Sequence, residues 1–143
     1  MRLSKYFTKS EAEFSITAAN HGRKNSMGPA STARAKLIAV KVMDKIREYY
    51  GVPIVPSSWF RGKWLNKQVG GSLNSQHCIG EAVDFRVPGV SVKQVYEDIK
   101  SGKIPGVVYD QLIYEIRKGG AVQWIHISYT ERRKNRMMAW IDR

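Results

Sequence analysis

Two β-prone segments on either side of Gly119-Gly120 constrain the fold of this chain most strongly. The segments DQLIYEI and AVQWIHISY are rich in β-branched and aromatic residues, and a Gly-Gly pair between such segments favours a tight turn. A two-residue turn there fixes which residues face each other across the strands. It pairs Ile116 with Gln123, Glu115 with Trp124, and Ile113 with His126. The sequence therefore predicts an antiparallel hairpin of known register.

Periodicity and capping residues predict the other elements. Apolar residues recur at helical spacing from Ser31 or Thr32 to Tyr50, and Gly51 follows as a stop signal. The remaining predicted elements are a helix over 11–20 with a capping box of Ser10 and Glu13, strands over 52–56 and 82–87, and a helix over 91–101 capped by Ser91. We expect an α+β fold, a small antiparallel sheet with helices packed on one side. The apolar residues near the C-terminus, Met137, Met138, Trp140 and Ile141, are expected to pack back on it.

Length and cysteine content limit the class of protein. A chain of 143 residues has room for one ordinary domain, so we predict a single domain over 1–143, acting as a monomer. Cys78 is the only cysteine, which excludes an intrachain disulfide and a zinc cluster of several cysteines. Neither a membrane-spanning stretch nor a signal peptide is recognisable, and we therefore expect synthesis in the cytoplasm.

The charge of the chain is strongly positive. Lys and Arg total 24 against 12 Asp and Glu, a net charge of +12. Such a surface attracts polyanions, including the anionic polymers of a bacterial envelope. A nucleic-acid partner is not expected, because no motif for reading bases is present. The basic tail run ERRKNR is interpreted as a solvated face or as an envelope-binding segment.

Two histidines and an aspartate are candidates for a metal site. Strand alternation puts His126 on the face opposite Ile125 and Ile127, and it puts Asp84 opposite Val83 and Phe85. If the two strands are neighbours, Asp84 and His126 share an open face. His77 can join them from a loop that contains Gly80. Two imidazoles and a carboxylate with a free fourth position match a catalytic zinc site.

These residues also carry a family resemblance. SQHCIGEAVD has the pattern SxHxxGxAxD, and it is followed by the W-x-H of Trp124 and His126. The chain resembles, from about Phe7 to Tyr129, the zinc D-alanyl-D-alanine carboxypeptidases and phage L-alanyl-D-glutamate endopeptidases of the hedgehog-like clan. The resemblance implies a hedgehog/DD-peptidase-like fold and Zn²⁺ bound by His77, Asp84 and His126. It also implies that Arg61 holds a substrate carboxylate and that Ser75 and Trp124 contact the substrate.

The general base departs from the family pattern. Many members carry an acid three residues before the last histidine, where this chain has Gln123, and glutamine cannot accept a proton from water. The predicted hairpin places Glu115 diagonal to His126, within reach of a metal site, and phage-type relatives show a similar "DQLIxE". We expect Glu115 to be the base. The alternative is a surface glutamate paired with a nearby Lys or Arg, in which case the enzyme is impaired or uses a bulge that re-aims Gln123.

Several other residues have open roles. His21 is expected to be solvated, and Cys78 to be a small buried residue. Asp110 either caps a turn or orients a ligand histidine. Trp59, Trp64 and Tyr129 either line the groove or belong to the core.

The expected function is zinc-dependent hydrolysis of a peptide bond in the stem peptide of bacterial peptidoglycan. The enzyme would be a phage or bacterial lytic protein that reaches the cell wall after release, at phage lysis or as part of a virion. Carboxypeptidase and endopeptidase activity both remain open. The alternative is a zinc-stabilised binding or structural module of the same fold without turnover.

Overall fold

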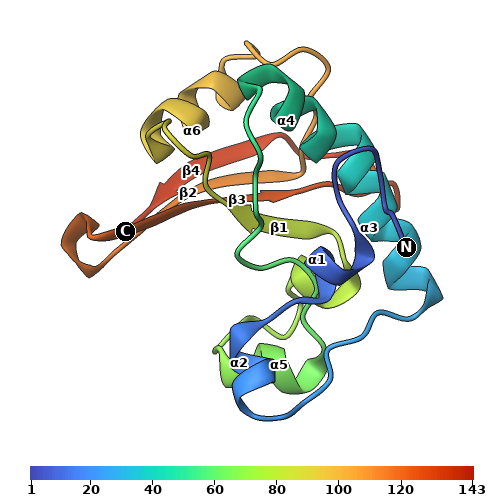
Figure 1. Ribbon diagram of the computed structural model, residues 1–143. Helices are drawn as coiled ribbons and strands as arrows, with labels where there is room; N and C mark the ends of the chain where they lie inside the picture. The colour runs from blue at the N-terminus through green and yellow to red at the C-terminus, as the bar shows by residue number, and fades with distance from the viewer.

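The computed structural model describes residues 1–143 as helices arranged around a four-stranded sheet (Figure 1). The strands are β1 (Ala82–Phe85), β2 (Gln111–Arg117), β3 (Val122–Ser128) and β4 (Met138–Asp142), in the spatial order β1-β3-β2-β4. The α-helices are α1 (Lys9–Glu13), α2 (Ile16–Asn20), α3 (Pro29–Ile38), α4 (Asp44–Tyr50), α5 (Lys63–Gln68) and α6 (Val92–Lys100). Shorter helical segments are η1 (Ala39–Met43), η2 (Gln76–Ile79) and η3 (Lys118–Gly120). The α+β class is confirmed.

The hairpin of β2 and β3 has the predicted register. Ile116 pairs with Gln123, Glu115 with Trp124, and Ile113 with His126. The last pair is Arg117 with Val122, so a four-residue loop over 118–121 replaces the predicted two-residue turn. The register survives because both loops are centred on Gly119-Gly120, which adopts positive φ angles of 63° and 99°.

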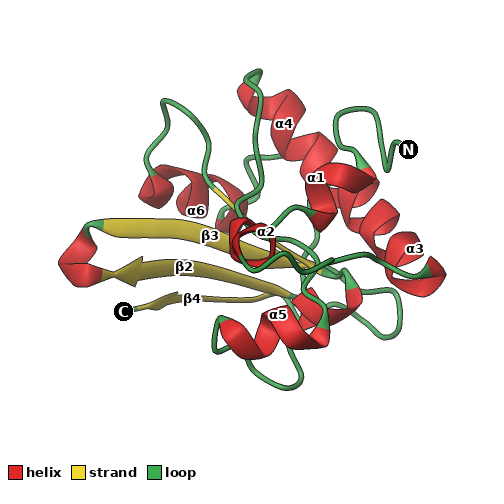
Figure 2. Cartoon of the chain, turned by 60° about the horizontal axis from the view of Figure 1, so that its bottom comes forward, coloured by secondary structure: helices red, strands yellow, loops and turns green.

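The sheet is mixed rather than purely antiparallel, and this corrects the prediction. β4 runs parallel to β2 at the edge of the sheet, with Gln111 opposite Met138 and Glu115 opposite Asp142. Figure 2 shows β3, β2 and β4 side by side, with the C-terminus next to the hairpin loop. The tail side chains do not pack back as expected: Met137, Met138, Trp140 and Ile141 are 36–48% exposed. Three of these residues lie on β4, an edge strand with a neighbouring strand on one side only, and Met137 directly precedes it.

The long helical segment predicted before Gly51 is present. α3, η1 and α4 follow each other without a break from Pro29 to Tyr50, and Gly51 ends them with a left-handed φ of 68°. Helix α6 is also confirmed, because the Ser91 side chain accepts a hydrogen bond from the backbone N–H of Gln94.

Three local predictions are wrong. The N-terminal helix is two short helices, and the capping box consists of Thr8 and Glu11 rather than Ser10 and Glu13. Residues 52–56 form no strand, although Ser58 makes an isolated bridge to Asp84. Helix α5 lies between the predicted strands over 52–56 and 82–87, where no helix is predicted. Each of these segments is short, so tertiary contacts outweigh its local preference.

The core lies on one face of the sheet. Val83, Phe85, Ile125 and Ile127 are fully buried and belong to one cluster with residues of α3, η1, α4 and α6. Figure 1 shows α4 and α6 above the sheet and α2 and α5 below it. The alternate side chains of β1 and β3 therefore point away from this core, into the region where the candidate site lies. None of the helices combines the length and the hydropathy needed to cross a bilayer.

Candidate active site

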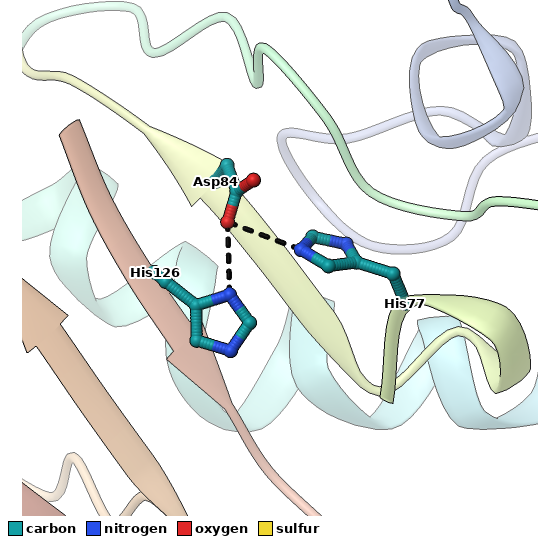
Figure 3. Close-up of side chains that lie close together, drawn as sticks. All are labelled: His77, Asp84 and His126. Atoms are coloured by element: carbon teal, nitrogen blue, oxygen red, sulfur yellow. Dashed lines mark hydrogen bonds and ion pairs between the residues drawn. The ribbon is translucent and has the colours of Figure 1, made fainter. Parts of the chain in front are cut away.

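His77, Asp84 and His126 converge from three elements, η2, β1 and β3 (Figure 3). One oxygen of Asp84, Oδ1, lies 3.1 Å from Nε2 of His77 and 3.0 Å from Nδ1 of His126. One potential ligand atom from each residue lies within 4.8 Å of the others. The structure thus brings together the three residues that the sequence nominates as metal ligands.

Backbone geometry explains how the three side chains meet. Asp84 and His126 are direct partners across β1 and β3. His77 arrives on η2, whose backbone is fixed when the Ser75 side chain accepts the His77 N–H. η2 ends at Gly80 with a φ of 84°, and a Cβ atom there would lie 2.6 Å from the Ser31 carbonyl oxygen. Only glycine fits this turn against α3.

The hydrogen bonds of His77 leave one ring nitrogen directed at Asp84. Its Nδ1 lies 2.6 Å from the carbonyl oxygen of Trp59, which can only accept, so Nδ1 carries the hydrogen. In the neutral ring Nε2 then presents a lone pair to the carboxylate of Asp84. Two acceptors at 3.1 Å need a proton or a cation between them. Two imidazoles and one carboxylate are the ligands of a catalytic zinc ion, so this donor set fits zinc.

Asp84 remains ionised in this setting. The residue is 6% exposed, and burial alone would raise its pKa. Where the facing nitrogens of His77 and His126 carry protons, their charge and hydrogen bonds outweigh burial and hold the pKa of the Asp84 carboxyl well below its usual range. The charged form that a metal requires is therefore the stable one.

The seven residues predicted as metal ligands, catalytic groups or substrate contacts all line one cleft of about 540 Å³. They are Arg61, Ser75, His77, Asp84, Glu115, Trp124 and His126. The cleft wall also contains Arg132, Arg133 and Arg136, which sequence reasoning did not assign to the site. The signal that could have found them is the basic run ERRKNR directly after β3.

Arg61 is anchored beside the metal ligands. Its Nη2 lies 3.4 Å from Oδ2 of Asp84, and its Nε donates to Oγ of Ser58 at 3.2 Å. The side chain is 17% exposed. Arg61 is therefore not a freely solvated loop arginine, and it presents a fixed positive charge to the cleft.

Glu115 lies beside Trp124 on the cleft side of the hairpin. Its side chain is 13% exposed, and Oε1 accepts a hydrogen bond of 2.9 Å from Nη2 of Arg117. Burial raises the pKa of Glu115, the neighbouring Asp142 adds to the rise, and Arg117 opposes it. The glutamate thus both faces the cleft and pairs with an arginine.

Gln123 points away from the cleft. Its Oε1 accepts a hydrogen bond of 2.6 Å from the Tyr114 hydroxyl, and its Nε2 donates to the carbonyl of Gly120. Pairing between β2 and β3 is continuous from Leu112 to Arg117, so no bulge re-aims this side chain. An acid at this position would lie on the wrong face of the strand.

Asp110 has neither of the two roles considered for it. It is fully buried and binds Arg133 and Arg136, with one oxygen 2.7 Å from Nη1 of Arg133. This pairing holds the pKa of Asp110 well below its usual range even though burial acts in the opposite direction. Asp110 therefore fixes the chain that follows β3.

The remaining candidates lie outside the cleft wall. Trp59 is 1% exposed in the core, and Cys78 is half-buried with its thiol pKa raised by burial. His21 is exposed and packs edge-on against Trp64. Tyr129 packs on the core and donates its hydroxyl to Glu131.

The sequence of the chain matches one known family of proteins. The model of the Peptidase M15 family matches residues 5–128, a range that contains the three candidate ligands, Arg61 and Glu115. A search of curated proteins found no match. The family match covers most of the chain, so this protein belongs to the peptidase M15 family of metal-dependent, typically zinc, peptidases.

Proposed function

We propose that residues 1–143 form one zinc peptidase domain that hydrolyses a peptide bond in the stem peptide of bacterial peptidoglycan. The observation that carries the proposal is the convergence of His77, Asp84 and His126 at the wall of an open cleft. A zinc ion held by these residues would supply Lewis acidity, which polarises a carbonyl group and makes water easier to deprotonate.

Glu115 is proposed as the general base. It is paired with Trp124, one diagonal step from His126, and such neighbours lie about 7 Å apart between backbones. The carboxylate would take a proton from the attacking water and pass it to the leaving amine. Its partial burial and raised pKa suit a group that must both accept and donate a proton.

Arg61 is proposed to hold a carboxylate of the substrate. Its guanidinium is fixed by Ser58 and Asp84, so little side-chain freedom is lost when a substrate binds. Ser75 and Trp124 line the same cleft, and we propose that they contact the peptide beside the reacting bond.

The charge of the whole chain supports a target in the cell wall. A net charge of +12 favours association with an anionic envelope. We propose that the enzyme acts on the wall after release from the cell in which it is made, either at phage lysis or as part of a virion.

Two observations favour a second function, a metal-stabilised binding module without turnover. Glu115 already forms an ion pair with Arg117, and the family's usual acid is replaced by Gln123. In such a module zinc would stabilise the fold, and Glu115 would only neutralise Arg117.

Purified muropeptides separate the two functions. Incubation with the protein and Zn²⁺, followed by mass spectrometry, is expected to show cleaved stem peptides, and a chelator is expected to prevent cleavage. Loss of a terminal D-alanine would identify a carboxypeptidase, and separation of L-alanine from D-glutamate would identify an endopeptidase. Intact muropeptides with a zinc-loaded protein would favour the module.

A further inference from the structure

The loop between β3 and β4 contributes three arginines to the cleft wall. Arg132, Arg133 and Arg136 all line the cleft, and all lie beyond residue 128, where the family match ends. Their side chains are 41–46% exposed. We call this set the arginine cluster.

Two buried carboxylates hold the arginine cluster in place. Arg133 and Arg136 both bind Asp110, and Arg132 binds both oxygens of Glu81, at 2.7 and 3.0 Å. Asp110 and Glu81 are 0% and 1% exposed and are not part of the cleft wall. The buried carboxylates thus hold the guanidinium groups on the side away from the cleft, while the arginine side chains line the cleft.

The arginine cluster retains positive charge and free donors. Asp110 has one negative charge for two arginines, and Glu81 also lies 4.0 Å from Arg34. A guanidinium has five N–H donors, and Arg132 and Arg136 each use only Nε and Nη2 in hydrogen bonds to carboxylates. Pre-positioned guanidinium groups with free N–H donors are suited to bind a carboxylate.

The sheet register places the arginine cluster relative to the metal centre. Asp110 directly precedes Gln111, the first residue of β2, and so lies three residues before the row that pairs Ile113 with His126. Glu115 lies two residues beyond that row, on the opposite side. Three strand residues span about 10 Å, which is also the length of about three residues of an extended peptide.

We infer that the arginine cluster is a substrate subsite for a free carboxylate located about three residues from the bond that is cut. This inference rests on the proposed peptidase function and adds a substrate class to it: acidic peptides whose carboxylate is not amidated. The subsite lies at the opposite end of the cleft from Glu115.

The first test changes the substrate and leaves the protein intact. Two stem peptides are compared that differ only in whether the carboxylate three residues from the cleaved bond is free or amidated. The zinc-loaded enzyme is expected to have a kcat/KM about tenfold higher for the free acid, the effect of one charged hydrogen-bonded pair. Equal values would overturn the subsite. Hydrolysis of neither peptide would contradict the proposed function instead.

The second test changes the subsite. Arg132→Gln is expected to remove most of the preference for the free acid, while Lys134→Gln, which removes the same charge from the same loop but outside the cleft wall, keeps it. Binding of both peptides to the Glu115→Gln protein by calorimetry gives the same comparison without turnover. Thermal unfolding checks that Arg132→Gln is folded. If it is not folded, the comparison of the two peptides with the unaltered protein remains the test of the subsite. The inference would be overturned if Arg132→Gln kept the preference for the free acid, or if Lys134→Gln lost that preference to the same extent.

Discussion

Asp84 and His126 face each other directly across β1 and β3, and Oδ1 of Asp84 lies 3.0 Å from Nδ1 of His126. Main-chain hydrogen bonds of the sheet therefore fix the spacing of two of the three candidate ligands. The position of His77 is set differently, by the short helix η2, which ends at Gly80.

Removal of either histidine is expected to abolish tight zinc binding. Both His77→Ala and His126→Ala take away one of three ligands, and affinity should fall by at least about 100-fold. Competition with a chromogenic chelator measures the loss. His21→Ala is the matched control, because His21 is exposed and lies outside the cleft wall, and it should bind zinc like the unaltered protein. Unchanged affinity in His126→Ala would rule out the proposed metal centre.

Glu115→Gln should separate catalysis from metal binding. The amide keeps the size of the side chain but cannot accept a proton, so hydrolysis should slow by about 100-fold or more while zinc affinity stays the same. Gln123→Glu should not rescue this variant, because residue 123 lies on the other face of β3. Full activity of Glu115→Gln on muropeptides would assign the base elsewhere.

The pH dependence of hydrolysis should follow the neighbours of Glu115. A general base works only when deprotonated, so a raised pKa places the acidic limb of the rate profile above the ordinary glutamate value of 4.5. Asp142 raises this pKa and Arg117 lowers it. Asp142→Asn should therefore move the limb of kcat/KM to lower pH, and Arg117→Gln should move it to higher pH. Shifts in the same direction for both variants would contradict Glu115 as the titrating base.

Gly80→Ala is expected to damage the metal centre through the backbone. The added Cβ would meet the Ser31 carbonyl oxygen at 2.6 Å in addition to the strain of a positive φ, and the free energy of unfolding should drop by more than about 2 kcal/mol. Gly89→Ala has a similar φ of 79° but open space around it, and about 1 kcal/mol is expected there. Urea unfolding and zinc titration of both variants test this. Equal losses would mean that close packing at Gly80 is unimportant.

Local patterns in the sequence were sufficient for the elements that carry the metal ligands. Alternation along β1 and β3 separates Asp84 and His126 from the buried residues beside them, and the Gly-Gly loop fixes the register of Glu115 and Trp124. These features depend on neighbouring residues or on a short hairpin, where side-chain direction follows from a period of two. Even an error of two residues in the turn length left the register unchanged.

Contacts between segments far apart in the sequence determined the remaining features of the sheet and of the cleft. The sequence by itself determined the α+β class, the β2–β3 register and the residues that could bind a metal. Tertiary structure alone determined that β4 joins β2 in parallel, that Gln123 bonds to Tyr114, and that the arginine cluster turns toward the cleft. Glu81 and Arg132 are 51 residues apart, and Asp110 and Arg133 are 23 apart. No local periodicity encodes such pairs, because they form only when the folded chain buries a carboxylate that requires a partner.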